Sequence, residues 1–131
     1  MDWKNLFFAF QGRVGRKSFW LGSLALCVVV FVIYGVAGAL FTQWAPGAEA
    51  GSYVAVSTSP IGWLLYILAT IVSIWGGIAI QMKRWHDRDK SGWWCLIGLV
   101  PVVGPIWALV ETGFLRGTAG ANRFGSDPLA G

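Results

Sequence analysis

Two charge-free apolar runs, residues 19–41 and 61–82, constrain this chain more than any other feature of its sequence. An α-helix rises about 1.5 Å per residue, so each run would reach about 33 Å as a helix. The hydrocarbon core of a bilayer is about 30 Å thick. The first run is also longer than the apolar part of a secretion signal, which is about 7 to 15 residues. The runs therefore predict an integral membrane protein with two transmembrane helices, of which the first is retained as an anchor.

The composition agrees with a membrane location. Hydrophobic residues make up 56% of the chain and charged residues only 12%, whereas soluble domains carry about 25% charged residues. Most of the nine tryptophans lie near the ends of apolar segments, where indole rings favour the lipid headgroup zone. The formal charge of +4 comes from basic residues beside the apolar segments. We therefore expect the phospholipid bilayer, with anionic lipids, as the partner and no nucleic acid.

The distribution of Lys and Arg predicts an orientation. Residues 1–18 contain four basic side chains, residues 42–59 contain none, and residues 83–91 contain four. Loops rich in Lys and Arg remain on the cytoplasmic side of a bacterial membrane. We expect the N-terminus and the 83–91 loop to be cytoplasmic and the 42–59 loop to be external.

A third apolar segment, residues 92–115, is interrupted by Pro101 and Pro105. Proline breaks or kinks a helix, so two arrangements remain. A single kinked helix would cross the bilayer and leave Arg116 and Arg123 outside. A re-entrant hairpin would keep both arginines in the cytoplasm, but its broken backbone would need cover from protein. We favour the single span, because two basic residues are a weak signal and the tail is short.

The fold class expected from these segments is an all-α membrane protein, a small bundle of three membrane segments in one domain. Trp3, Phe7 and Phe10 recur at helical spacing and predict a short interfacial helix within residues 1–18, the cytoplasmic segment. Residues 116–131 form a glycine-rich tail. Small residues permit close helix packing in lipid, so we expect the second helix to meet the first through small side chains: Ala69, Ser73 and Gly77 against Gly35 and Ala39.

Residues 83–94 read Lys-Arg-Trp-His-Asp-Arg-Asp-Lys-Ser-Gly-Trp-Trp and contain the only histidine. One interpretation is purely topogenic, with basic residues fixing orientation at the headgroups. A second makes the loop a receptor for headgroups, together with the basic residues before the first run. The proposed lipid- or partner-binding residues are Arg13, Arg16, Lys17, Lys83, Arg84, Trp85, His86, Asp87, Arg88, Trp93 and Trp94.

A third interpretation, a metal or catalytic site at His86, Asp87 and Asp89, has less support. Four cationic side chains in the same loop oppose a divalent ion, and no second histidine completes a ligand set. Cys27 and Cys95 have no ligand spacing either. We expect no catalytic residue, no metal and no cofactor.

The C-terminal stretch, residues 117–128, is rich in residues that form turns. Asn and Asp side chains bond to nearby backbone and glycines permit positive φ, so this stretch predicts an ordered cap. Its structural motif comprises Asn122, Arg123, Gly125 and Asp127. We expect the cap to dock onto the 83–91 loop only if the third segment is re-entrant.

Three stretches of the chain together resemble a bacterial inner-membrane family known as domain of unknown function 805. They are Phe10-Gln-Gly-Arg-Val-Gly-Arg-Lys-Ser-Phe-Trp20, Arg84-Trp-His-Asp-Arg-Asp-Lys-Ser-Gly-Trp-Trp94 and Gly120-Ala-Asn-Arg-Phe-Gly-Ser-Asp-Pro128. The resemblance extends from about Trp3 to Pro128 and implies a small multi-span protein of the bacterial cytoplasmic membrane. This chain has Trp85 where the family usually has an aliphatic residue. The family has no established activity to transfer.

The function expected from the sequence is therefore that of a non-enzymatic membrane protein. Its basic, aromatic cytoplasmic face would bind anionic lipid headgroups or dock on a membrane partner. The alternatives are an accessory subunit of a larger complex and, with least support, a small oligomeric transporter or channel. Transport paths usually need polar groups within the bilayer, and the two clearest spans offer only Ser23, Thr70 and Ser73.

Overall fold

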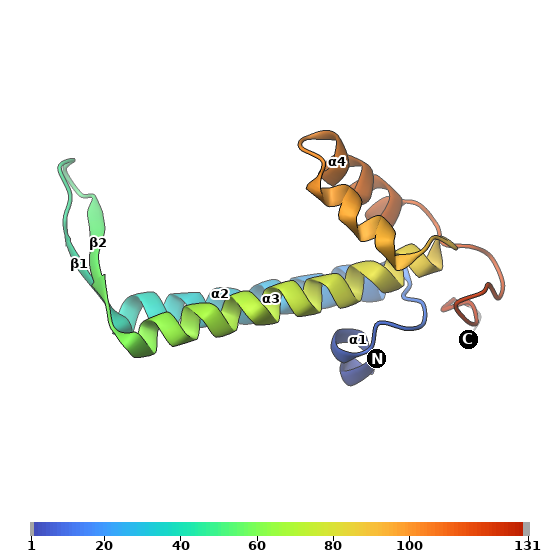
Figure 1. Cartoon of the computed structure of the whole chain (residues 1–131), viewed down its shortest axis with the longest axis horizontal. Coiled ribbons are helices and arrows are strands. Elements are labelled where there is room, and N and C mark those ends of the chain that lie inside the picture. Colours follow the sequence, from blue (N-terminus) through green and yellow to red (C-terminus); the bar gives the residue numbers. More distant parts are fainter. Residues whose placement is uncertain (1, 130–131) are drawn as a thin grey trace. The chain divides into compact units, whose positions relative to one another are not determined.

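The structure, a computed structural model, describes residues 2–129 (Figure 1). Its elements, in chain order, are α1 (Trp3–Phe8), α2 (Arg16–Phe41), β1 (Thr42–Pro46), β2 (Tyr53–Thr58), α3 (Pro60–Asp87), the 3-10 helix η1 (Gly92–Leu99), α4 (Val103–Leu109) and the π-helical turn η2 (Val110–Phe114). They form two compact units. We call residues 1–26 and 75–131 the basic unit, and residues 27–74 the strand unit.

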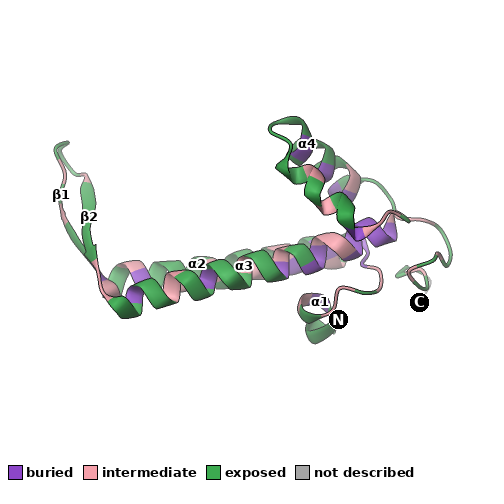
Figure 2. Cartoon of the chain, in the orientation of Figure 1, coloured by how far each residue is buried: buried purple, intermediate pink, exposed green. Residues whose placement is uncertain are grey.

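The two predicted transmembrane runs lie within the two long helices, α2 and α3. Both are long and apolar enough to span a membrane, and only 6% and 22% of their apolar windows are buried. Many of their large apolar side chains are exposed, and the colouring shows exposed positions along both helices (Figure 2). Helices that are apolar on their outward surface are typical of proteins in lipid.

In the basic unit, α1 packs through Leu6, which is 4% exposed. Leu6 joins Val14, Phe19 and Ile80 in one apolar cluster. Gly22 makes this approach possible, because a Cβ at that position would lie 2.8 Å from Leu6 Cδ2. The predicted N-terminal helix is therefore present, and its buried leucine packs it against the helix pair.

In the strand unit, α2 and α3 meet through Ala37 and Ala69, both fully buried. Tyr34 Oη and Thr70 Oγ1 lie 2.8 Å apart across the same helix pair. The predicted small-residue contact is right for Ala69 but wrong for Gly35, beside which a Cβ would meet no atom within 4 Å.

The predicted contact is also wrong in the basic unit, where Gly76 rather than Gly77 faces α2. A Cβ at Gly76 would lie 3.1 Å from Leu26 Cδ1, whereas one at Gly77 would meet nothing within 4 Å. The contact positions on α3 follow a spacing of alternately three and four residues, as in other antiparallel helix pairs. Positions spaced strictly by four residues rotate off that face after two turns. The predicted set of Ala69, Ser73 and Gly77 therefore includes a residue, Gly77, that does not face α2.

The 42–59 loop contains a strand pair, which corrects the expected all-α fold. β1 and β2 are antiparallel, with Thr42 opposite Thr58 and Ala45 opposite Val54. The sequence of β2, Tyr-Val-Ala-Val-Ser-Thr, is rich in the β-branched and aromatic residues that favour strands. This composition is the sequence signal from which strand β2 could have been predicted.

The third apolar segment is a hairpin, so the expectation of a single kinked helix is wrong. η1 ends at Leu99, and the chain turns through Val102, whose φ is +65°. Gly104 then lies against Ile97 O, with no room for a Cβ. The hairpin begins near Trp85, whose ring lies 5.9 Å from that of Trp94. At its other end, Gly113 O accepts a hydrogen bond from Trp20 Nε1. The hairpin therefore begins and ends at the same end of the α2 and α3 pair.

Candidate functional site

The site is built on the last turn of α3, which continues through residues 83–87 where the sequence predicted a loop. Residues three and four apart share a face of a helix, so Lys83, Arg84 and Asp87 point to one side. Lys83 donates to the carbonyls of Asn5 and Leu6 and is 1% exposed. This turn therefore carries charged side chains that are buried by the segments around it.

Asp87 is the centre of a buried charge cluster. Arg13 donates to its Oδ1 from Nε at 3.1 Å and from Nη2 at 2.9 Å. Arg84 Nη1 donates to the other oxygen, Oδ2. The side chains of Arg13, Arg84 and Asp87 are 1%, 0% and 5% exposed. Two guanidinium groups face one carboxylate, so the cluster needs further acceptors to offset its excess positive charge.

Backbone carbonyls of the C-terminal tail are the further acceptors around Arg13. Its Nη2 donates to Thr118 O at 2.6 Å and its Nη1 to Gly120 O at 2.6 Å. The amide of Thr118 in turn donates to Asp87 O at 2.7 Å. A Cβ at Gly117 would overlap the Asp87 carboxylate, so only glycine fits beside the cluster.

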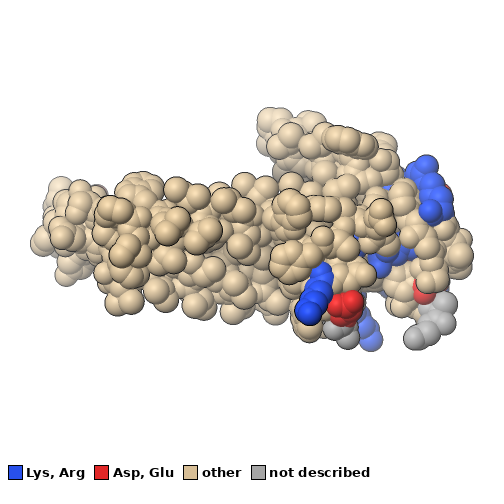
Figure 3. Space-filling view, turned by 60° about the horizontal axis from the view of Figure 1, so that its bottom comes forward, with Lys and Arg blue, Asp and Glu red and all other residues tan. Residues whose placement is uncertain are grey.

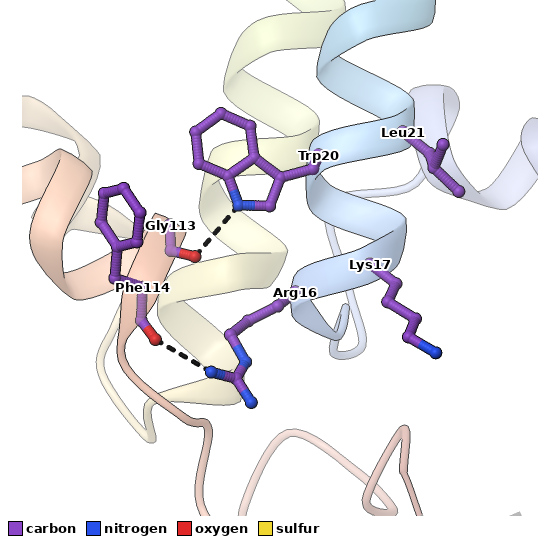
Figure 4. A pocket seen from close by; sticks show the side chains of 6 residues that line it. All are labelled: Arg16, Lys17, Trp20, Leu21, Gly113 and Phe114. Atoms are coloured by element: carbon purple, nitrogen blue, oxygen red, sulfur yellow. Dashed lines mark hydrogen bonds between the residues drawn. The ribbon is translucent and has the colours of Figure 1, made fainter.

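A second set of carbonyls, at the end of η2, accepts from the neighbouring cations. Arg84 donates to Thr112 O and Leu115 O. Arg16 Nη1 donates to Phe114 O at 3.1 Å, and Trp20 Nε1 donates to Gly113 O at 3.1 Å (Figure 4). Carbonyls at a helix end lack partners within the helix. The basic residues thus fix the hairpin's return to the start of α2.

His86 joins the first and third family motifs. Its ring stacks on Phe124 with centroids 4.0 Å apart and an interplanar angle of 6°. Its Nδ1 lies 3.1 Å from Gly12 O, a carbonyl, so Nδ1 carries the proton and donates. Asn122 Nδ2 donates to His86 O at 2.9 Å. The imidazole is therefore held between two chain segments, and no group of metal-binding side chains occurs among residues 2–129.

Asp127 closes the C-terminal cap. Its carboxylate accepts hydrogen bonds from the amides of Leu129 at 2.9 Å and Gly120 at 3.0 Å. These two bonds, with Leu129 the larger influence, lower the pKa of Asp127 from its ordinary value. Arg123 Nε reaches Asp89 Oδ1 at 3.4 Å on the exposed side of the same cap. The predicted docking of the cap onto residues 83–91 is therefore present.

Glu111 was not among the site residues predicted from the sequence. Its carboxylate accepts from Arg88 at 2.9 Å and from Lys90 at 2.8 Å, and Lys90 Nζ lies 5.0 Å from the Trp94 ring centre. Glu111 is the single acidic residue within the long apolar segment 92–115, and this is the sequence signal that could have identified it. It ties η2 to the residues that follow α3.

The structure divides the predicted headgroup ligands into two groups. Arg13, Lys83 and Arg84 are buried and bonded to protein atoms, so they are closed to a headgroup. Arg16, Lys17, Trp93 and Trp94 are exposed. Within residues 2–129, the carboxylate and guanidinium groups of the Arg13, Arg84 and Asp87 cluster bond to one another and to backbone carbonyls. The cluster can therefore hold chain segments together. Of the residues predicted to bind lipid, the exposed ones are those whose side chains reach the protein surface.

Comparison with known proteins identifies relatives but no activity. The family model "Protein of unknown function (DUF805)" matches residues 7–126, which confirms the predicted resemblance. "Inner membrane protein YhaH" of Escherichia coli K12 is 32% identical over 98% of this chain and 97% of its own length. "Inner membrane protein YhaI" of the same strain is 33% identical over 93% of this chain and 87% of its own length. No solved structure matches the chain.

Proposed function

The chain belongs to the family of unknown function DUF805, and from this premise we propose a non-enzymatic, multi-pass protein of the bacterial inner membrane that binds anionic lipid at the cytoplasmic surface. The relatives named above are inner membrane proteins. Their names state no reaction and no ligand, so lipid binding is argued from the residues of this chain alone.

One observation carries the proposal, which is the separation of charge between the two units. All ten Lys and Arg residues belong to the basic unit, and none belongs to the strand unit. On the face shown in Figure 3, the blue side chains gather on the basic unit's surface. The retention of basic segments in the cytoplasm favours an orientation with the N-terminus inside. Anionic headgroups of the inner leaflet are then the nearest counter-charges.

Exposed cations supply the binding energy in this proposal. Lys4 on α1 and Arg16 and Lys17 at the start of α2 are exposed. A basic residue near an anionic membrane surface contributes about 1 kcal/mol, so the three together would give about 3 kcal/mol. This corresponds to about a hundredfold enrichment of anionic over neutral lipid. The buried arginines contribute indirectly, by holding the segment that carries these side chains.

Lipid analysis of the purified protein tests the proposal. The protein is extracted in mild detergent at low salt, and its bound phosphatidylglycerol and cardiolipin are compared with their proportion in the source membrane. We expect enrichment that falls when Lys4, Arg16 and Lys17 are all changed to Gln, and that falls at high salt because charge attraction is screened. Equal lipid composition in the purified wild-type protein and the source membrane would reject the proposal.

Docking on a membrane partner is a second candidate, supported by the strand pair. Trp44, Tyr53 and Val56 are 52%, 68% and 61% exposed on a two-stranded sheet, and such a sheet is marginally stable without further packing. A photo-crosslinking residue placed at Tyr53 should give one discrete adduct with a second membrane protein. The same residue at Phe31, exposed on α2, serves as the lipid-facing control. Identical products at both positions would reject this candidate.

A further inference from the structure

A groove in the basic unit combines cationic and apolar side chains (Figure 4). Arg16 and Trp20 lie between two borders, with Lys17 and Leu21 on one side and Gly113 and Phe114 on the other. Its volume is about 600 Å³, within the range of about 300 to 1,000 Å³ typical of small-molecule sites. The groove is therefore large enough for a headgroup and the chain segments next to it.

The charge of the groove is positive without internal compensation. Arg16 and Lys17 are its charged residues, and no acidic side chain from the described part of the chain, residues 2–129, lines it. Only Nη1 of Arg16 donates to Phe114 O, which leaves N–H groups of the same guanidinium for another acceptor. Lys17 is exposed and extends away from the helix (Figure 4). Both cations can therefore reach an anion at the rim.

The rest of the groove is apolar. The rings of Trp20 and Phe114 lie 6.0 Å apart, and the only polar side-chain atom of Trp20, Nε1, is already bonded to Gly113 O. Lys17 is also the last charged residue before the apolar run of α2. Cations at the rim and an aromatic wall at this level match a molecule that has a phosphate at one end and hydrocarbon at the other.

We propose that this groove is a defined binding site for one anionic glycerophospholipid, with its phosphate on Arg16 and Lys17 and an acyl chain along Trp20, Leu21 and Phe114. The inference rests on the proposed function and deepens it, because it replaces general attraction to the inner leaflet with one site. A soluble phosphate compound would use the two cations but leave the apolar wall in contact with nothing, so the membrane lipid is the occupant.

A titration of the full-length protein with phosphatidylglycerol or phosphatidylcholine, in a neutral detergent and read by native mass spectrometry, tests the site. We expect the first phosphatidylglycerol to bind the wild-type protein more tightly than phosphatidylcholine. Lys17→Gln should weaken this binding about fivefold, as expected for one basic residue at an anionic headgroup. Lys17→Arg keeps the charge and should bind like wild type.

Arg116→Gln is the matched control, since it removes the same charge from an exposed position in the basic unit that does not line the groove. We expect it to bind phosphatidylglycerol like wild type. A preference that is equal in wild type, Lys17→Gln and Arg116→Gln, or that weakens equally in both variants, would overturn the groove while leaving the proposed function intact. An absence of preference in wild type would overturn both.

Two further arms test the apolar part of the proposal. Leu21→Gln places a polar amide on the apolar border, and it should weaken phosphatidylglycerol binding while leaving the charge unchanged. Glycerophosphoglycerol, the deacylated form of phosphatidylglycerol, keeps the single charge of the phosphodiester but has no acyl chains, and it should not displace the lipid at equal concentration. Displacement at equal concentration would show that charge alone is recognised and would overturn the acyl-chain contact.

Discussion

Arg13 Nη2 lies 2.9 Å from Asp87 Oδ1, although the two residues are separated by 74 positions in the chain. This pair joins the segment before α2 to the last turn of α3. The same guanidinium group bonds to the carbonyls of Thr118 and Gly120 in the tail. Three sequence motifs that lie far apart in the chain thus converge on one guanidinium group, that of Arg13.

Substitution of Asp87 by Asn is expected to destabilise the protein. It would leave the buried guanidinium groups of Arg13 and Arg84 without their counter-charge, which costs about 3 to 5 kcal/mol in comparable buried pairs. The measurement is a denaturant titration in mild detergent, followed by tryptophan fluorescence. Asp89→Asn is the control, because the Asp89 side chain is 48% exposed and exposed pairs contribute about 0 to 1 kcal/mol. Equal losses in the two variants would contradict the central role of Asp87.

Substitution of Gly117 by Ala is expected to loosen the tail. The new Cβ would overlap the Asp87 carboxylate, which is fixed by two arginines and cannot easily move. Overpacking of this kind costs about 1 to 3 kcal/mol. Limited trypsin digestion in detergent should cleave the variant faster after Arg116. Gly98→Ala, where the added Cβ would meet nothing within 4 Å, should digest at the wild-type rate; faster digestion of both variants would count against the contact.

The hairpin of residues 92–115 predicts that the tail lies on the same membrane side as the N-terminus. Single cysteines at Ala50 and Ser126, both exposed, can be compared in a background in which Cys27 and Cys95 are Ala. A membrane-impermeant maleimide should label the Ala50→Cys protein in intact cells. It should label the Ser126→Cys protein only after the inner membrane is disrupted. Labelling at position 126 in intact cells would show that the third segment crosses the bilayer.

The C-terminal cap is expected to be sensitive to acid at Asp127. Hydrogen bonds from Leu129 and Gly120 lower the pKa of this carboxyl from 3.8. A carboxyl whose folded pKa is lowered stabilises the fold above its unfolded pKa, and that contribution is lost as the pH falls through the folded value. The carboxyl carbon shift of Asp127, followed by NMR in detergent, should titrate with a midpoint below 3.8, and the Gly120 amide should follow it.

Asp127→Asn is the control for this titration. It lacks an ionisable group at this position, so the Gly120 amide shift should no longer follow that midpoint. A midpoint at or above the ordinary value in the wild-type protein would show that the two amides do not bond to the carboxylate in solution.

The family could be predicted from the sequence because its motifs are contiguous runs of residue types around Arg13, His86 and Asn122. The role of those residues could not. Basic side chains beside an apolar run are usually exposed to headgroups, and Arg13 and Arg84 follow this pattern in sequence while being buried in the structure. Their burial depends on the carbonyls of Leu115 and Thr118, more than twenty-five residues further along the chain.

The sequence by itself determined that two long helices are apolar over a membrane's thickness and that all basic residues lie outside residues 27–74. These properties depend on composition within short windows, and no distant contact is needed to read them. Only the tertiary structure decided that the third segment turns back, that β1 and β2 pair, and that Asp87 gathers two arginines. Each of these depends on which distant backbone carbonyls and side chains come within hydrogen-bonding distance, and that is set by how the chain packs.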